Sequence, residues 1–187
     1  MSEAHASRCT EALHRLGFVV IGAADGSSGL VSRELCRDCT EAALSLLSGH
    51  LDRVREVLDI DPTKTIFNFH EICQRADRGL RYDMKVQPSA SGALWHRLFD
   101  RVDRVVSPML ARARMFDQRE AESGEASLSA GCGSINFHGV VVAAPGAPTQ
   151  HYHPDGMSAG VVNVFIPLVD VDHINGPTEF KAGAATT

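Results

Sequence analysis

The sequence lacks the features that mark several classes of protein. No apolar run approaches the roughly 20 residues of a membrane helix, and residues 1–5 have neither the basic nor the apolar region of a secretory signal. Positive charge is not in excess: the formal net charge is −5, which does not indicate a nucleic-acid partner. The phosphate-binding pattern G-x-x-x-x-G-K-[ST] is also missing. We therefore expect a cytoplasmic protein without a membrane span.

A disulfide framework is not indicated either. The 5 cysteines are an odd number and are widely spaced, which is typical of a reducing compartment. Cys36 and Cys39 form a C-x-x-C pattern, but they lie in a helical pattern and no second pair accompanies them. We therefore interpret them as two incidental helix cysteines and not as a redox or zinc site.

The composition is that of an ordinary globular domain. The chain has 187 residues, of which 44% are hydrophobic and 22% are charged, enough for one domain with a real core. We predict a single domain over residues 1–187, with a helical part over about residues 1–125 and a β core over about residues 126–187.

The helical part shows clear periodic patterns. Spacing of apolar residues predicts a helix over residues 6–16, a strand over residues 17–21, and a long helix that Ser32 caps. The dipeptide Asp61-Pro62 is expected to end that helix, because proline disfavours the helical conformation in the residue before it. Residues 66–70 fit either a strand or the start of a helix.

Further elements follow in the same part. Residues 81–86 predict a short strand, and Ser91 is a plausible cap for another helix that continues to Met109. Pro108 should kink that helix or mark its last turn.

The last third of the chain favours strands. Residues 132–143 are rich in β-branched side chains, and residues 161–169 carry the strongest strand signal, with Pro167 indicating an edge or a bulge. Because helices come first and strands follow, the pattern predicts the α+β class.

One motif in this part suggests chemistry. Residues 150–156, Gln-His-Tyr-His-Pro-Asp-Gly, place His153 and Asp155 two positions apart. On a strand such residues point to the same face, so an imidazole and a carboxylate could hold one metal ion together. They would supply two of the three ligands of a 2-His-1-carboxylate site for Fe(II). The triplet alone is a weak signal, because it arises often by chance.

The context of this motif resembles a known family. Residues 145–156, 162–170 and 175–180 resemble, in order and spacing, the phytanoyl-CoA dioxygenase-like branch of the Fe(II)/2-oxoglutarate oxygenases. The resemblance covers the last ~55 residues well and the first ~60 loosely. It implies N-terminal helices that flank a partial double-stranded β-helix, a jelly-roll or cupin-like core.

The resemblance also implies an enzyme and its cofactors. It makes His153 and Asp155 the catalytic iron ligands and 2-oxoglutarate the co-substrate for hydroxylation of a small-molecule or acyl substrate. Gln150 and Tyr152 would line the cofactor pocket, although packing within the barrel is equally compatible with them. Asn163 would face 2-oxoglutarate, and a solvent-facing position is its alternative.

The chain departs from the family at its end. The family's second His ligand and an Arg that binds 2-oxoglutarate follow later strands, which the resemblance places beyond Thr187. We therefore expect the domain to be incomplete at its C-terminal end. His151 or His173 could replace the missing ligand, but we prefer a non-ligand role for both. A partial barrel leaves strand edges unpaired, which predicts self-association.

Two other functions stay open. One is a catalytically dead remnant that acts as a binding module. The other is a cupin-like metalloenzyme that does not use 2-oxoglutarate and takes all its ligands from these 187 residues.

Overall fold

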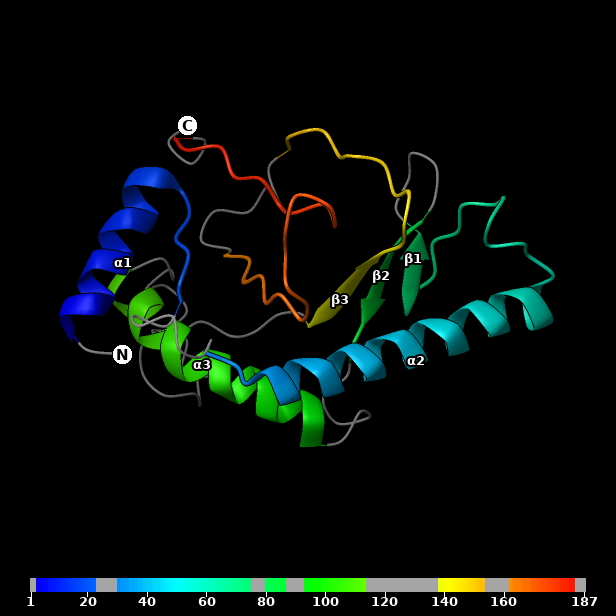
Figure 1. The fold of residues 1–187 in the computed structure, drawn as a ribbon, viewed down its shortest axis with the longest axis horizontal. Helices are drawn as coiled ribbons and strands as arrows, with labels where there is room; N and C mark the ends of the chain where they lie inside the picture. The colour runs from blue at the N-terminus through cyan, green and yellow to red at the C-terminus, as the bar shows by residue number, and fades with distance from the viewer. Residues whose placement is uncertain are drawn as a thin grey trace, which may run out of the picture.

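The computed structural model describes residues 3–22, 30–74, 80–86, 93–113, 138–153 and 162–183 (Figure 1). Their helices and strands are, in chain order, α1 (Glu3–Leu16), α2 (Arg33–Leu58), β1 (Ile72–Gln74), β2 (Arg81–Lys85), α3 (Ala93–Ala113) and β3 (Gly139–Ala143). The predicted α+β class is confirmed. A jelly-roll core is not seen in the described part of the chain, which contains a smaller sheet.

The helices begin where the sequence predicts, but one of them ends early. Ser32 caps α2, and its hydroxyl accepts a hydrogen bond from the backbone N–H of Leu35 at 3.2 Å. The helix ends at Leu58, because Asp59 adopts the left-handed conformation with a φ of 53°. The prediction that Asp61-Pro62 ends this helix was therefore wrong by about one turn. The chain has already turned at Asp59, three residues before Pro62.

Helix α3 contains Pro108, five residues before its last residue, Ala113. The predicted cap of this helix, Ser91, lies outside the described residues. Residues 66–70 do not start a helix: Asn68 forms an antiparallel bridge with Cys73.

The three strands form an antiparallel sheet in the order β1-β2-β3. Met84 of β2 lies between Ile72 of β1 and Val140 of β3 in the register, and all three side chains are buried. Val141, the next residue of β3, is exposed on the opposite face. This alternation gives the sheet one apolar face, as the period of two residues per strand requires. The predicted strands at 81–86 and within 132–143 are thus confirmed where the structure describes them.

Two apolar clusters hold these elements together. In the larger, the inner face of the sheet packs against α2 and α3, with Cys39 and Trp95 among the buried residues. In the smaller, Leu13 of α1 packs against Met109 of α3. Figure 1 shows α2 running along the lower end of the sheet and α1 standing apart from the sheet, beside α3.

The segment 162–183 bridges both clusters without forming a strand. Val162 packs against the smaller cluster, and Ile166 and Leu168 pack against the larger one. The hydroxyl of Thr40 in α2 lies 3.1 Å from the carbonyl oxygen of Leu168 and 2.9 Å from that of Cys36. In Figure 1 this segment, coloured orange to red, passes between the sheet and α1.

The predictions of strands at residues 17–21 and 161–169 are therefore corrected. Residues 17–21 and 162–169 are described without strand structure. Some apolar side chains of each run pack against the two clusters, as Ile21 and Ile166 do, whereas others such as Val20 are exposed. Neither run pairs with a neighbouring strand in the described part of the chain. A strand needs such a partner for its backbone hydrogen bonds, and apolar composition alone does not supply one.

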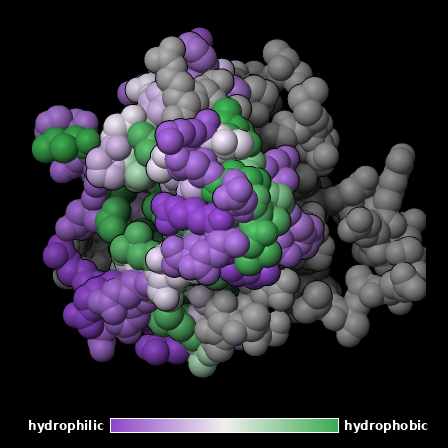
Figure 2. All heavy atoms as spheres, turned by 90° about the vertical axis from the view of Figure 1, so that its right-hand side faces the viewer, coloured by the Kyte–Doolittle hydropathy of each residue, from purple (hydrophilic) through white to green (hydrophobic). Residues whose placement is uncertain are grey.

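The surface near the C-terminal end of α2 is partly apolar. Val57 and Leu58 at the end of this helix and Ile66 in the following loop are exposed. Figure 2 views the molecule from this end and shows hydrophobic patches between hydrophilic side chains. Among the residues that the structure describes, no helix is both long and apolar enough to cross a membrane.

Candidate functional site

The H-x-D segment is reached through a turn anchored on the sheet. The backbone N–H of Ala144 donates to the carbonyl of Leu80 at 2.7 Å, just beyond the last pair of β2 and β3. Gly146 then turns the chain with a φ of 85°, a conformation that favours glycine. The guanidinium of Arg81 donates to the carbonyl of Pro148 at 3.3 Å. These contacts fix where the chain leaves the sheet on its way to His153.

In the structure, His153 does not lie on a strand. Residues 147–153 are not in a strand, so the shared strand face that we expected for His153 and Asp155 is not formed up to His153. Asp155 itself lies outside the described residues. Its place relative to the imidazole of His153 stays a prediction.

His153 is oriented by its own backbone neighbourhood. Its Nδ1 lies 2.7 Å from the carbonyl oxygen of His151. A carbonyl oxygen can only accept, so Nδ1 must carry the proton in this contact. In the neutral form of this tautomer, the lone pair of the ring is on Nε2. Metal-binding histidines are commonly oriented in this way, with the other ring nitrogen bonded to a backbone carbonyl.

Tyr152 connects the motif to another of the family-like segments. Its hydroxyl donates to Oε2 of Glu179 at 2.5 Å, although the tyrosine is 67% exposed. The hydrogen bond and the negative charge of Glu179 both raise the pKa of Tyr152. The bond ties residues 150–153 to the segment 175–180.

The other candidate residues are at the surface. Gln150, His151, Asn163 and His173 are all exposed. Among the described residues, no group of three or more His, Cys, Asp or Glu side chains is arranged to hold a metal ion. Neither His151 nor His173 is therefore placed as a third ligand together with His153 and another such side chain in that part of the chain.

The C-x-x-C pair in α2 has the environment of structural cysteines. Cys39 is fully buried and Cys36 is partly buried, and both are free. Burial raises the pKa of both thiols, and that of Cys39 rises to about 11. Because the thiolate is the reactive and metal-binding form, this environment disfavours redox or zinc chemistry.

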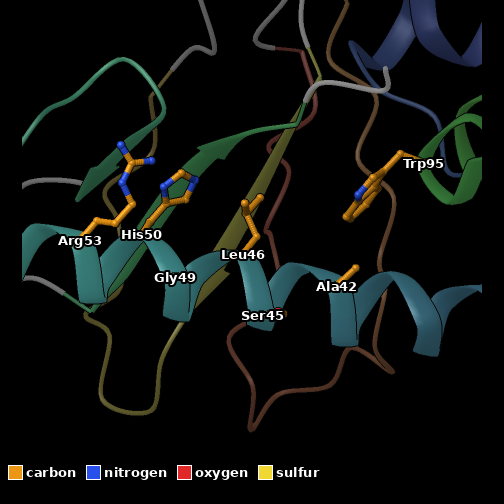
Figure 3. Close-up of a pocket in the computed structure, with 7 residues that line it drawn as sticks. All are labelled: Ala42, Ser45, Leu46, Gly49, His50, Arg53 and Trp95. Carbon is orange, nitrogen blue, oxygen red and sulfur yellow. The ribbon is translucent and has the colours of Figure 1, made fainter. Parts of the chain in front are cut away.

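A second candidate site lies on α2, and the sequence argument missed it. Figure 3 shows Leu46, His50 and Arg53 projecting from one side of this helix, with Trp95 extending from α3 over the same side. They line a hollow of about 520 Å³, together with Ala42, Ser45 and Gly49. The α2 residues have helical spacing in the sequence. Without the position of α3, however, the sequence does not show whether this face of the helix lies in the core or lines an open hollow.

No family model, no curated protein and no solved structure matches this chain. The family resemblance therefore rests on the three segments of the sequence alone.

Proposed function

We propose that this protein is an Fe(II)- and 2-oxoglutarate-dependent oxygenase that acts on a small-molecule or acyl substrate. The sequence support is the resemblance of the three segments at residues 145–156, 162–170 and 175–180. The structural observation that carries the proposal is the contact between Nδ1 of His153 and the carbonyl of His151. In the neutral tautomer with the proton on Nδ1, Nε2 carries the ring lone pair, which is the atom that a metal ligand uses.

The described donor set fits an iron ion only in part. His153 suits Fe(II) as one imidazole ligand, and Asp155 would supply the carboxylate. Among the described residues, which do not include Asp155, no group of three His, Cys, Asp or Glu side chains is arranged to hold a metal ion. When bound, iron and 2-oxoglutarate supply the activation of O2 for hydroxylation of a C–H bond.

The chain's own residues would position the groups around this centre. In the proposal, Tyr152 and Glu179 hold the motif against the segment 175–180 through their hydrogen bond. Gln150 and Asn163, both exposed, contribute polar side chains for 2-oxoglutarate. As part of the same proposal, the core of the domain is a partial double-stranded β-helix.

The test is an anaerobic Fe(II) titration of the 187-residue protein, with and without 2-oxoglutarate. We expect the weak visible charge-transfer band of chelated 2-oxoglutarate to saturate. His153→Ala and Asp155→Ala should abolish the band. His70→Ala is the matched control, because His70 is exposed and pairs with Glu71 at 3.8 Å, away from the motif. A folded protein without a band contradicts the proposal.

The same titration separates the alternatives. Metal binding that depends on His153 but does not respond to 2-oxoglutarate indicates a cupin-like metalloenzyme. No metal binding by folded protein indicates a binding module. His151→Ala and His173→Ala test the replacement ligands, since loss of the band in either variant would assign that histidine to the metal.

A further inference from the structure

The hollow on α2 has the size of a ligand site. Its volume of about 520 Å³ lies within the range of small-molecule pockets, about 300–1,000 Å³. A neighbouring hollow of about 180 Å³ continues it past His50 and Arg53, which line both. Together they form a groove, which we call the α2 groove. It belongs to other elements than the His153 segment and does not rest on the function proposed above.

The α2 groove has apolar walls on both sides of a polar centre, which His50 and Arg53 form. Leu46 and the nearly fully buried Trp95 line the larger hollow. Val54 and Phe69 are among the residues that line the smaller one. Apolar walls with a few polar groups are the usual composition of small-molecule sites, so the ligand should carry an apolar body.

The polar centre carries a positive charge without a fixed partner. In the described part of the chain, neither the side chain of Arg53 nor that of His50 makes a hydrogen bond or an ion pair. The side chain of Arg55 on the same helix, in contrast, pairs with Asp52 at 3.3 Å. A guanidinium presents paired N–H donors that match a carboxylate. Glu71 lines the smaller hollow and opposes an anion there, although His70 lies 3.8 Å from it.

The charge of the centre limits the charge of the ligand. Burial and the neighbouring Arg53 lower the pKa of His50, against a smaller opposite effect of Glu71. The lowered pKa favours the neutral imidazole, so Arg53 supplies the positive charge among the described residues that line the groove. One positive charge matches a monoanion better than a phosphate dianion.

We propose that the α2 groove binds a monocarboxylate with an apolar body, with the carboxylate on Arg53 and the body against Leu46 and Trp95. Trp95 is the only tryptophan of the chain. Its fluorescence therefore reports on the groove directly.

The experiment is a titration of the whole protein with octanoate, followed by tryptophan fluorescence. We expect a saturable change, with octanol, its uncharged counterpart, binding about tenfold more weakly, the effect of one charge-assisted hydrogen bond. Arg53→Gln should weaken octanoate binding by about the same factor. Glu71→Gln should strengthen it, because it removes the opposing carboxylate.

Arg55→Gln is the matched control, since it removes a cation from the same helix outside the groove. It should leave octanoate binding unchanged. Circular dichroism checks that each variant is folded. The proposal is overturned by no saturable response, by equal binding of octanol and octanoate, or by equal effects of the two arginine variants. Stronger octanoate binding in Arg53→Gln would overturn it as well.

Discussion

Asp61 shows how a local turn alters the ionisation of one side chain. Its carboxylate accepts hydrogen bonds from the backbone N–H of Thr63 at 2.9 Å and from the Thr63 hydroxyl at 2.6 Å. Lys64 lies 3.1 Å away. The Thr63 hydroxyl is the largest cause, and these contacts lower the pKa of Asp61 from its ordinary 3.8 to about 2. Hydrogen bonds to the charged form explain the direction.

We predict that Thr63→Val raises the pKa of Asp61 toward 3.8, measured by NMR titration of its carboxyl carbon. A lowered carboxyl pKa stabilises the fold above the unfolded value, and this contribution is lost as pH falls through the folded value. The wild type should therefore lose more stability than Thr63→Val between about pH 4 and 2. Thr65→Val, an exposed neighbour, is the control. An unchanged Asp61 pKa in Thr63→Val would refute the hydrogen-bond explanation.

His138 gives a pH dependence of the same sign, but at a higher pH. Its ring stacks on Phe99 with centroids 4.0 Å apart, and its Nε2 is buried without a hydrogen-bond partner. Burial, and then the neighbouring His96, lower the pKa of His138 from 6.5. The unfolded chain therefore takes up the proton first as the pH falls, so the folded state loses stability below about pH 6.5.

The measurement is the free energy of unfolding at several pH values, from urea denaturation. Wild type should lose stability from about pH 7 to 5.5, and His138→Gln should lose less over the same interval, whatever its stability at pH 7. His173→Gln, at an exposed position, should keep the wild-type slope. Equal slopes for wild type and His138→Gln would show that His138 does not cause the effect.

Helix α2 is capped by Ser32, the residue before its first residue, Arg33. The Ser32 hydroxyl accepts the N–H of Leu35, one of the donors that a helix start leaves without a partner. We predict that Ser32→Ala lowers the free energy of unfolding by about 1 kcal/mol. Ser45→Ala, in the middle of the same helix, should have little effect, since alanine favours a helix interior. Equal losses in both variants would contradict a capping role.

The helices and strands differ in how well the sequence predicts them. Spacing and the Ser32 cap predict α2 because a helix makes its hydrogen bonds within one segment. The prediction of a strand at the apolar run 161–169 was wrong for residues 162–169, because a strand depends on a partner from elsewhere in the chain. Residues 81–85 did become a strand, since β1 and β3 flank them on both sides.

The candidate site was predictable only as a set of residue types. The sequence places His153 beside family-like neighbours. The proton on its Nδ1 is inferred from the carbonyl of His151, whose direction cannot be read from the spacing of residue types. The α2 groove requires α2 and α3 to meet, and that packing follows from the whole core. The groove thus depends on tertiary packing and the His153 tautomer on the local backbone conformation, and hydrophobic periodicity captures neither.

Segments far apart in the sequence meet in an aromatic cluster. The rings of Phe18 and Phe180 stack with centroids 5.1 Å apart, and Phe165 meets Phe180 edge-on at 6.1 Å. The backbone N–H of Gly183 donates to the carbonyl of Leu16 at 3.1 Å. The cluster therefore fastens the segment 162–183 to the end of α1.

We predict that Phe180→Ala lowers the free energy of unfolding by about 1 kcal/mol, because it removes two aromatic contacts at a half-exposed position. Trypsin should also cleave faster after Lys181. Val171→Ala is the control, since Val171 is similarly exposed but has no ring contact. Unchanged stability and cleavage in Phe180→Ala would show that the cluster does not hold the segment.

The stacking of Phe18 on Phe180 also has a consequence for synthesis on the ribosome. Phe18 is synthesised 162 residues before its partner ring, Phe180. The stacking contact therefore cannot form until Phe180 has left the ribosome. Chaperones that bind nascent chains would find a target here, on the N-terminal side of a contact that forms only after Phe180 has been added.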